Sequence, residues 1–289
     1  MHRYRASAII ILGILAGTLF WGAFWTSEPV YAGRRASAWI RDLQGRSQAE
    51  RERAESALRA MGTNVLPVIR RQLYVQDSTL KLTLVHLIWR QDRVRFRLML
   101  ARSWRARAAM ACGVLGAEAQ PLIPDLLESA KGDFVSFELA VGAMTQIGEV
   151  GIPQFVGALT NANPRVRQAG ARVLGALGPK GKAGLGVLVK SLRDPDAQVR
   201  VNASAALGAI GVGSPEVVDG LANALGDANS EVRDNALDAL GQLGLPARAA
   251  IPAVVQLLSD PDELVRSDAT NVLETLPVHE RVRRTNEVR

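Results

Sequence analysis

The chain has 289 residues, 48% of them hydrophobic and 5% aromatic, with a net charge of +7. That is enough for a large core, in one elongated domain or two compact ones, and the single cysteine, Cys112, excludes an internal disulfide. Residues 1–107 carry 19 Lys and Arg against 7 Asp and Glu, whereas residues 108–289 carry 16 against 21. This imbalance argues against a continuous basic track for nucleic acid along the whole chain.

Residues 6–25 form an uncharged stretch that predicts a transmembrane helix. At 1.5 Å per residue its length spans ~30 Å, about the hydrocarbon thickness of a bilayer. Positive charges precede the stretch, and Trp21 and Trp25 lie at its far end, as expected for a helix that runs outward from the cytoplasm. We therefore expect a signal anchor in a bacterial inner or plasma membrane, with residues 1–5 cytoplasmic, a linker over 26–35 and the body extracytoplasmic (periplasmic).

A cleavable signal peptide is the alternative for this segment. Val30, Tyr31 and Ala32 end in a small residue, and cleavage after Ala32 would give a secreted form. The apolar stretch exceeds the ~7–15 residues usual for signal peptides, which favours the anchor.

From about Ala36 the pattern predicts pairs of helices and no strands. A proline opens an apolar helical run in each of four first helices, where its missing N–H costs nothing: Pro67, Pro124, Pro153 and Pro252. A glycine closes each second helix, as is typical of C-terminal caps: Gly62, Gly116, Gly148, Gly178, Gly211 and Gly244. The wider interval between the first two of these glycines predicts an additional, degenerate hairpin with helices over 77–91 and 93–101.

An aspartate followed six residues later by an arginine recurs every 33 residues. The pairs are Asp194 and Arg200, Asp227 and Arg233, and Asp260 and Arg266. A fixed period of this length predicts stacked helical hairpins. We expect an all-α superhelix of about eight hairpins over 36–276, degenerate over 36–116 and regular over 160–276, with a polar tail at 277–289. Each aspartate is expected to cap its second helix and to pair with an arginine.

These units resemble HEAT repeats, of the short kind also called phycobilisome-lyase-type HEAT-like repeats. In that family the aspartates and arginines stack between neighbouring hairpins as a polar ladder. Two positions depart from the pattern: Arg167 has Asn161 in the aspartate position, and Phe137 replaces the arginine. The resemblance therefore implies an interrupted ladder there. The N-terminal portion also resembles bacterial membrane-anchored HEAT-repeat proteins, which places Tyr31 and Trp39 in a cap over the first hairpin.

The sequence contains no pattern that indicates catalysis, a cofactor or a metal. Two of the three histidines, His2 and His279, lie in the terminal tails, and His86 lies on an apolar helix where a packed histidine is expected. Histidine and cysteine residues do not have zinc spacing, and no phosphate-binding or dinucleotide-binding glycine motif occurs between a strand and a helix. We therefore expect a protein without enzymatic activity and without a small-molecule substrate.

Second helices are expected to line the concave face and to offer a polar, mildly acidic stripe to a protein partner. The stripe consists of Asn202, Asn235, Asp238, Asp268 and Asn271. The predicted function is a membrane-anchored scaffold for protein–protein interaction. Two alternatives remain: a HEAT-like lyase or accessory enzyme of the bilin-lyase type, and a basic face that binds nucleic acid or lipid through Arg90, Arg93, Arg95, Arg97, Arg102, Arg105 and Arg107.

Overall fold

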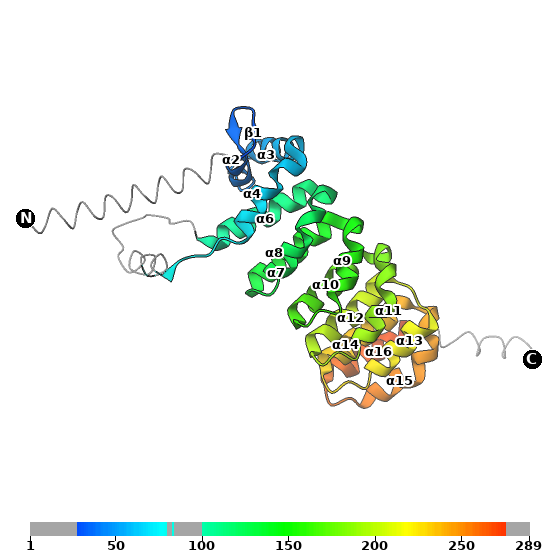
Figure 1. The fold of residues 1–289 in the computed structure, drawn as a ribbon. Coiled ribbons are helices and arrows are strands. Elements are labelled where there is room, and N and C mark those ends of the chain that lie inside the picture. Colours follow the sequence, from blue (N-terminus) through cyan, green and yellow to red (C-terminus); the bar gives the residue numbers. More distant parts are fainter. Residues whose placement is uncertain (1–27, 80–82, 84–99, 276–289) are drawn as a thin grey trace, which may run out of the picture.

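The computed structural model describes residues 28–79, 83 and 100–275 as an array of stacked helical hairpins (Figure 1). Each hairpin pairs a short first helix with a longer second helix. The first helices are α2 (Ala36–Asp42), α4 (Leu66–Leu73), α7 (Ile123–Ser129), α9 (Ile152–Ala158), α11 (Leu185–Ser191), α13 (Pro215–Ala224) and α15 (Ile251–Gln256). The second helices are α3 (Gln48–Met61), α6 (Ala101–Leu115), α8 (Phe134–Ile147), α10 (Pro164–Ala176), α12 (Ala197–Ile210), α14 (Ser230–Leu243) and α16 (Glu263–Thr275).

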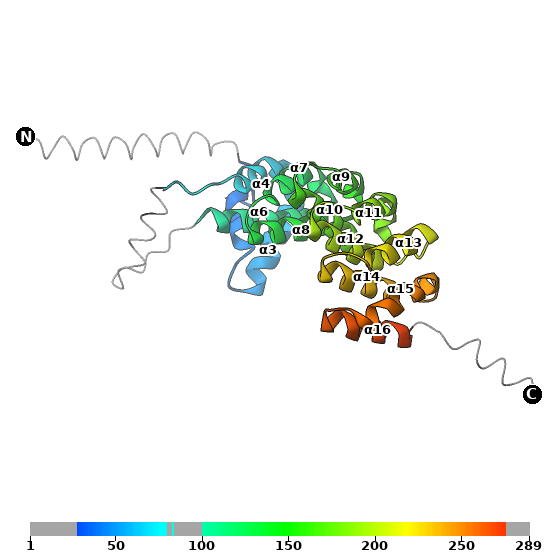
Figure 2. The same cartoon turned by 90° about the horizontal axis from the view of Figure 1, so that it is seen from below.

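The array bends, and the second helices lie along the inner side of the bend with the first helices outside them (Figure 2). Second helices pack on one another in sequence from α6 to α16. Small residues set this spacing. A Cβ atom at Gly208 would lie 2.8 Å from the Cα atom of Ala239, and one at Gly175 would lie 2.9 Å from that of Ala206. Glycine at these positions therefore brings neighbouring second helices into close contact.

The connections from second to first helices repeat one turn. The predicted closing glycines all have positive φ, from 54° to 81°, which L side chains rarely adopt. Five of the connections then run through a 3₁₀ segment: η1 (Gly62–Val65), η2 (Gly116–Leu122), η3 (Gly148–Gly151), η4 (Gly178–Gly184) and η5 (Leu245–Ala250), with a further one, η6 (Leu257–Ser259), after α15. Proline opens α4, α7, α9 and α15, so these sequence predictions are confirmed.

The second helices are capped two residues later than predicted. The side chain of Asp196, not that of Asp194, accepts the backbone N–H of Val199 at the start of α12. Asn229 does the same for Val232 in α14. The prediction that Asp194 caps its helix is therefore wrong, because its carboxylate is engaged in another way, described below.

The N-terminal end is covered by a small hairpin of two strands, β1 (Val30–Tyr31) and β2 (Arg34–Arg35). Trp39 donates its indole N–H to the carbonyl of Tyr31 at 3.1 Å. The guanidinium of Arg34 stacks over the Trp39 ring and pairs with Asp42. Tyr31 and Trp39 thus lie in a cap over the first hairpin, as the resemblance implied.

The predicted localisation in a membrane is contradicted. Among the described residues no helix is long and apolar enough to cross a bilayer. The longest, α6, has 15 residues, or ~22 Å, and a span needs ~30 Å. We therefore withdraw the single-pass assignment and the sidedness that followed from it. The proposed anchor over 6–25, the polar tail at 277–289, and nearly all of the additional hairpin lie outside the described residues.

Candidate functional site

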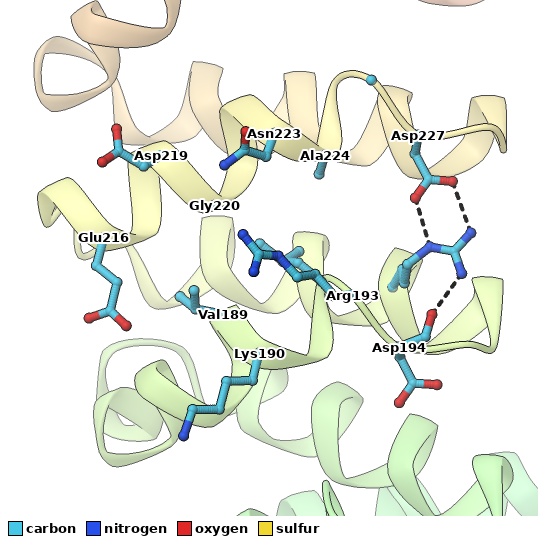
Figure 3. Close-up of a pocket in the computed structure, with 13 residues that line it drawn as sticks. Val189, Lys190, Arg193, Asp194, Glu216, Asp219, Gly220, Asn223, Ala224 and Asp227 are labelled. Atoms are coloured by element: carbon cyan, nitrogen blue, oxygen red, sulfur yellow. Dashed lines mark hydrogen bonds and ion pairs between the residues drawn. The ribbon is translucent and has the colours of Figure 1, made fainter.

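The recurring arginines and aspartates form rungs between neighbouring hairpins. Arg200 binds both carboxylate oxygens of Asp227 in the next hairpin, with Nε at 2.7 Å and Nη2 at 2.9 Å. Its Nη1 donates to the backbone carbonyl of Asp194 in its own hairpin at 2.8 Å. Each ladder aspartate also accepts the backbone N–H two residues ahead, so that Asp227 accepts from Asn229 at 2.9 Å. Every rung therefore links two turns through one guanidinium. Figure 3 shows the rung that joins the turns of Asp194 and Asp227.

The ladder is regular through the C-terminal half, and its most buried rung lies nearest the C-terminal end. Arg233 binds Asp260 in the same bidentate way, and their side chains are only 10% and 4% exposed. Hydrogen bonds from Arg233 lower the pKa of Asp260. Burial alone would raise the pKa of Asp227, but the bonds from Arg200 and the Asn229 N–H outweigh it and lower that pKa. These carboxylates are therefore held ionised as structural groups.

The ladder begins one hairpin earlier than the sequence implied. Arg167 binds Asp194 through Nε at 2.7 Å and Nη2 at 2.6 Å, and its Nη1 donates to the carbonyl of Asn161 at 2.9 Å. Because a backbone carbonyl serves here, the asparagine side chain at 161 does not interrupt the ladder. The interruption falls at Phe137, which has no guanidinium to offer.

A pocket of about 280 Å³ opens on the inner face where Phe137 interrupts the ladder. The guanidinium groups of Arg165 and Arg172 lie 5.3 and 5.4 Å from the centre of the Phe137 ring. Arg172 also makes two hydrogen bonds to the carboxylate of Glu138. At the rim Phe134 is 68% exposed, which is unusual for a large aromatic side chain. The pocket thus combines two phenylalanine rings with two arginines, one of which is paired with Glu138.

The pocket continues toward the C-terminus as a shallow groove between α10 and α12. This second depression, of about 310 Å³, shares Arg172 and Asn202 with the pocket and is otherwise lined by alanine and glycine. Small side chains leave room for an extended segment to lie against the helices. Asn202, one of the predicted stripe residues, stands where the two depressions meet.

The C-terminal end of the inner face is acidic. Burial raises the pKa of Asp234 to about 7, and the nearby carboxylates of Asp268, Asp238 and Asp262 add to the shift. Burial and Asp268 likewise raise the pKa of Asp238. One oxygen of Asp234 is buried without a hydrogen-bond partner. These residues of α14, α16 and the turn between them form an acidic end, in which the carboxylates repel one another.

The structure divides the predicted stripe. Asp238, Asp268 and Asn271 belong to the acidic end, and the Asn271 amide donates to Asp268 at 3.4 Å. Asn202 belongs to the groove. Asn235 instead donates to the carbonyl of Glu231 in its own helix. Sequence reasoning missed four inner-face residues, for which the only signal was the departure at position 137: Phe134, Glu138, Arg165 and Arg172.

A larger cleft lies between first helices, away from the inner face. It has a volume of about 990 Å³ between α11 and α13, with Lys190 and Arg193 on one wall and Glu216 and Asp219 on the other (Figure 3). Lys190 lies in the last turn of α11, Arg193 follows that helix, and Glu216 lies in the first turn of α13. The charges of Lys190 and Glu216 thus complement the dipoles of their own helices.

The structure describes only three of the seven arginines of the predicted basic face. Arg102, Arg105 and Arg107 lie on α6, whereas the other four arginines named for it fall outside the described residues. Arg107 donates to Gln44 at 2.9 Å, and burial, with Arg41 nearby, lowers its pKa. Among the described residues, no group of three metal-binding side chains comes together.

The fold is similar to that of several solved structures. The chain is similar to Kap121p at 14% identity, with a TM-score of 0.50 over 83% of this chain and 33% of that chain. It is also similar to the complex of CpcE and CpcF of phycocyanin lyase from Nostoc sp., at 23% identity and a TM-score of 0.47 over 53% of this chain and 98% of that chain. A designed armadillo repeat protein in complex with the peptide (KR)4 matches at 20% identity and a TM-score of 0.40, over 84% and 100% of the two chains. No curated protein sequence matches.

A bent array of helical hairpins with its second helices inside is an α-solenoid. Within it, residues 185–274 match the family model for HEAT repeats. This part of the chain is therefore built of HEAT repeats, and it contains three of the ladder aspartates and three of the ladder arginines.

Proposed function

We propose that the protein is a non-catalytic scaffold whose inner face binds an extended segment of a protein partner. The observation that carries this proposal is the open pocket at Phe137 and its continuation as a groove past Asn202. HEAT and armadillo repeats generally mediate protein interactions, so the fold agrees with this role.

The chemistry of the pocket favours a polypeptide as the occupant. Phe134 is exposed and offers an apolar side chain for a partner to contact. Beside it, Arg172 stacks on the ring of Phe137 and offers a cation with a fixed orientation. Aromatic residues and arginine are the side chains most enriched at protein interfaces. The floor of small residues admits backbone, and the Asn202 amide lies beside it as a hydrogen-bonding group.

The charge of the inner face reverses along its length. Arg165 and Arg172 lie at the pocket, and the carboxylates of Asp234, Asp238 and Asp268 lie at the C-terminal end. A partner segment with an acidic part and a basic part would therefore bind in one direction only. Reversed binding would place like charges together.

Quantitative affinity purification tests the proposal, with the full chain as bait in an extract of its source cells. One variant combines Phe134→Ala with Asp238→Lys and Asp268→Lys. The matched control combines Glu216→Lys with Asp219→Lys in the outer cleft. We expect the inner-face variant to lose its specific partners about tenfold or more, equivalent to ~1.4 kcal/mol, and the control to retain them. Equal recovery with both variants would overturn the proposal.

A further inference from the structure

Among the described residues, Arg266 is the one ladder arginine that has no aspartate to bind. Arg266 donates Nη1 to the carbonyl of Asp260 at 2.7 Å, as the earlier arginines do in their own hairpins. In those rungs Nε and Nη2 bind the carboxylate of the next hairpin, as in Arg200 with Asp227 and Arg233 with Asp260. Within the described residues no carboxylate faces Nε and Nη2 of Arg266. The guanidinium is therefore positioned as in an internal rung, with its bidentate side open.

The apolar surface beside this arginine is also uncovered. Leu258 is 43% exposed. The residues at the same place in the three preceding hairpins are covered by the hairpin that follows, and each is between 3% and 6% exposed: Leu159, Leu192 and Leu225. Val255 on the same helix is 47% exposed. The end of the last described hairpin thus presents the surface that a following hairpin covers elsewhere in this molecule.

We propose that this terminal face, formed by Val255, Leu258 and Arg266, binds a helical hairpin of a different protein. That hairpin carries a turn of the form Asp-x-Asp or Asp-x-Asn between its helices. The internal rungs define this chemistry, because each one places an aspartate two residues before the capping residue, where its carboxylate also accepts a backbone N–H. Such a carboxylate is pre-oriented for the open side of Arg266.

A second copy of the chain does not supply that turn from its first described hairpin. The first hairpin is capped by Ser47, and Gly45 stands two residues before it, where the rungs require aspartate. The nearby Asp42 is already bound by Arg34. The occupant is therefore a separate protein. The terminal face is distinct from the inner face, so this proposal does not depend on the groove.

Site-specific photo-crosslinking in the source cell tests the proposal. p-Benzoyl-phenylalanine replaces Leu258 in the full-length protein, and mass spectrometry maps the crosslinked residue. We expect a crosslink to another protein, within a helix–turn–helix segment that contains such an aspartate turn. Arg266→Gln should reduce the yield about tenfold, and Arg266→Lys should reduce it in part, because lysine keeps the charge but loses the bidentate geometry.

Two controls accompany the experiment. Arg248→Gln changes another exposed arginine of the last hairpin and should leave the yield unchanged. The same crosslinker at Tyr74, an exposed residue of the opposite half, should not capture the partner. A crosslink confined to a second copy or to residues 276–289 would overturn the proposal, and so would the absence of any crosslink. It is also overturned if the crosslinked segment lacks the aspartate turn, or if Arg266→Gln leaves the crosslinking yield unchanged.

Discussion

Arg200 binds the carboxylate of Asp227, which lies 27 residues further along the chain, through two of its nitrogens. The third nitrogen holds the turn of its own hairpin. A single side chain therefore couples two neighbouring repeats, and three such rungs in succession tie four hairpins together. In a solenoid, where stability depends on contacts between neighbours, this coupling makes adjacent repeats unfold together.

Removal of an internal rung should be costly. Arg233→Ala leaves the buried carboxylate of Asp260 without its cation, and breaking a buried pair typically costs ~3–5 kcal/mol. Arg266→Ala, at the open end, removes only bonds to backbone carbonyls and should cost about 1 kcal/mol. Urea denaturation of both variants measures the difference. Equal losses would show that the rungs do not couple the repeats.

The ladder should also make the protein sensitive to acid. Folding lowers the pKa of Asp227 and of Asp260. A lowered folded-state pKa contributes stability above the unfolded value of about 4, and this contribution is lost as the pH falls below it. The midpoint of thermal unfolding should therefore drop steeply below about pH 4. Asp260→Asn should lower the unfolding midpoint near neutral pH and make it depend less on pH below about 4. If this variant loses stability in acid as steeply as the parent, Asp260 is not a source of the acid sensitivity.

Asp234 should make the protein less stable as the pH rises, the opposite of the effect of Asp227 and Asp260. Its pKa in the folded protein is raised to about 7 by burial and by the carboxylates of Asp268, Asp238 and Asp262. The folded state then binds the proton more tightly than the unfolded state, so stability falls as the pH rises from about 4 to 7. Asp234→Asn should stabilise the protein at about pH 8 and change it little near pH 4.5. The idea fails if the urea midpoint shifts equally at both pH values.

Two glycine-to-alanine substitutions should have opposite signs. Gly208→Ala would place a Cβ atom 2.8 Å from the Cα atom of Ala239, and such overpacking between helices costs ~1–3 kcal/mol. Gly186→Ala, within α11, meets no atom within 4 Å and should stabilise the protein by about 0.5–1 kcal/mol. Thermal unfolding of the two variants against the parent compares them directly. If both substitutions destabilised the protein, the close contact of helices at Gly208 would not be the reason for its glycine.

Cys112 should report on opening of the array. Its side chain is fully buried, and burial raises the pKa of the thiol to about 12. Since the thiolate is the reactive form, labelling requires exposure of the sulfur by unfolding. A thiol reagent should react slowly with the native protein and rapidly in concentrated urea. Fast, stoichiometric labelling of the native protein would contradict the packing of α6.

The sequence predicts the hairpins well because their turns use residues with strong local preferences, such as Gly178 and Pro153. It misassigns the ladder for a geometric reason. With a period of 33, an aspartate six residues before one arginine is also 27 residues after the previous one, and the spacing alone does not distinguish the two partners. The inner-face pocket was not predicted, because stacking of Arg172 on Phe137 depends on neighbouring hairpins and leaves no periodic pattern.

Hydroxyl-radical footprinting tests the central claim most directly. The full-length protein is oxidised alone and with a partner recovered by affinity purification, and the modification of individual aromatic residues is measured. Phe134 on the inner face and Tyr74 at the C-terminal end of the first helix α4 are both exposed. The scaffold proposal predicts that the partner protects Phe134 and leaves Tyr74 unchanged. Protection of Tyr74 with an unprotected Phe134 would contradict it.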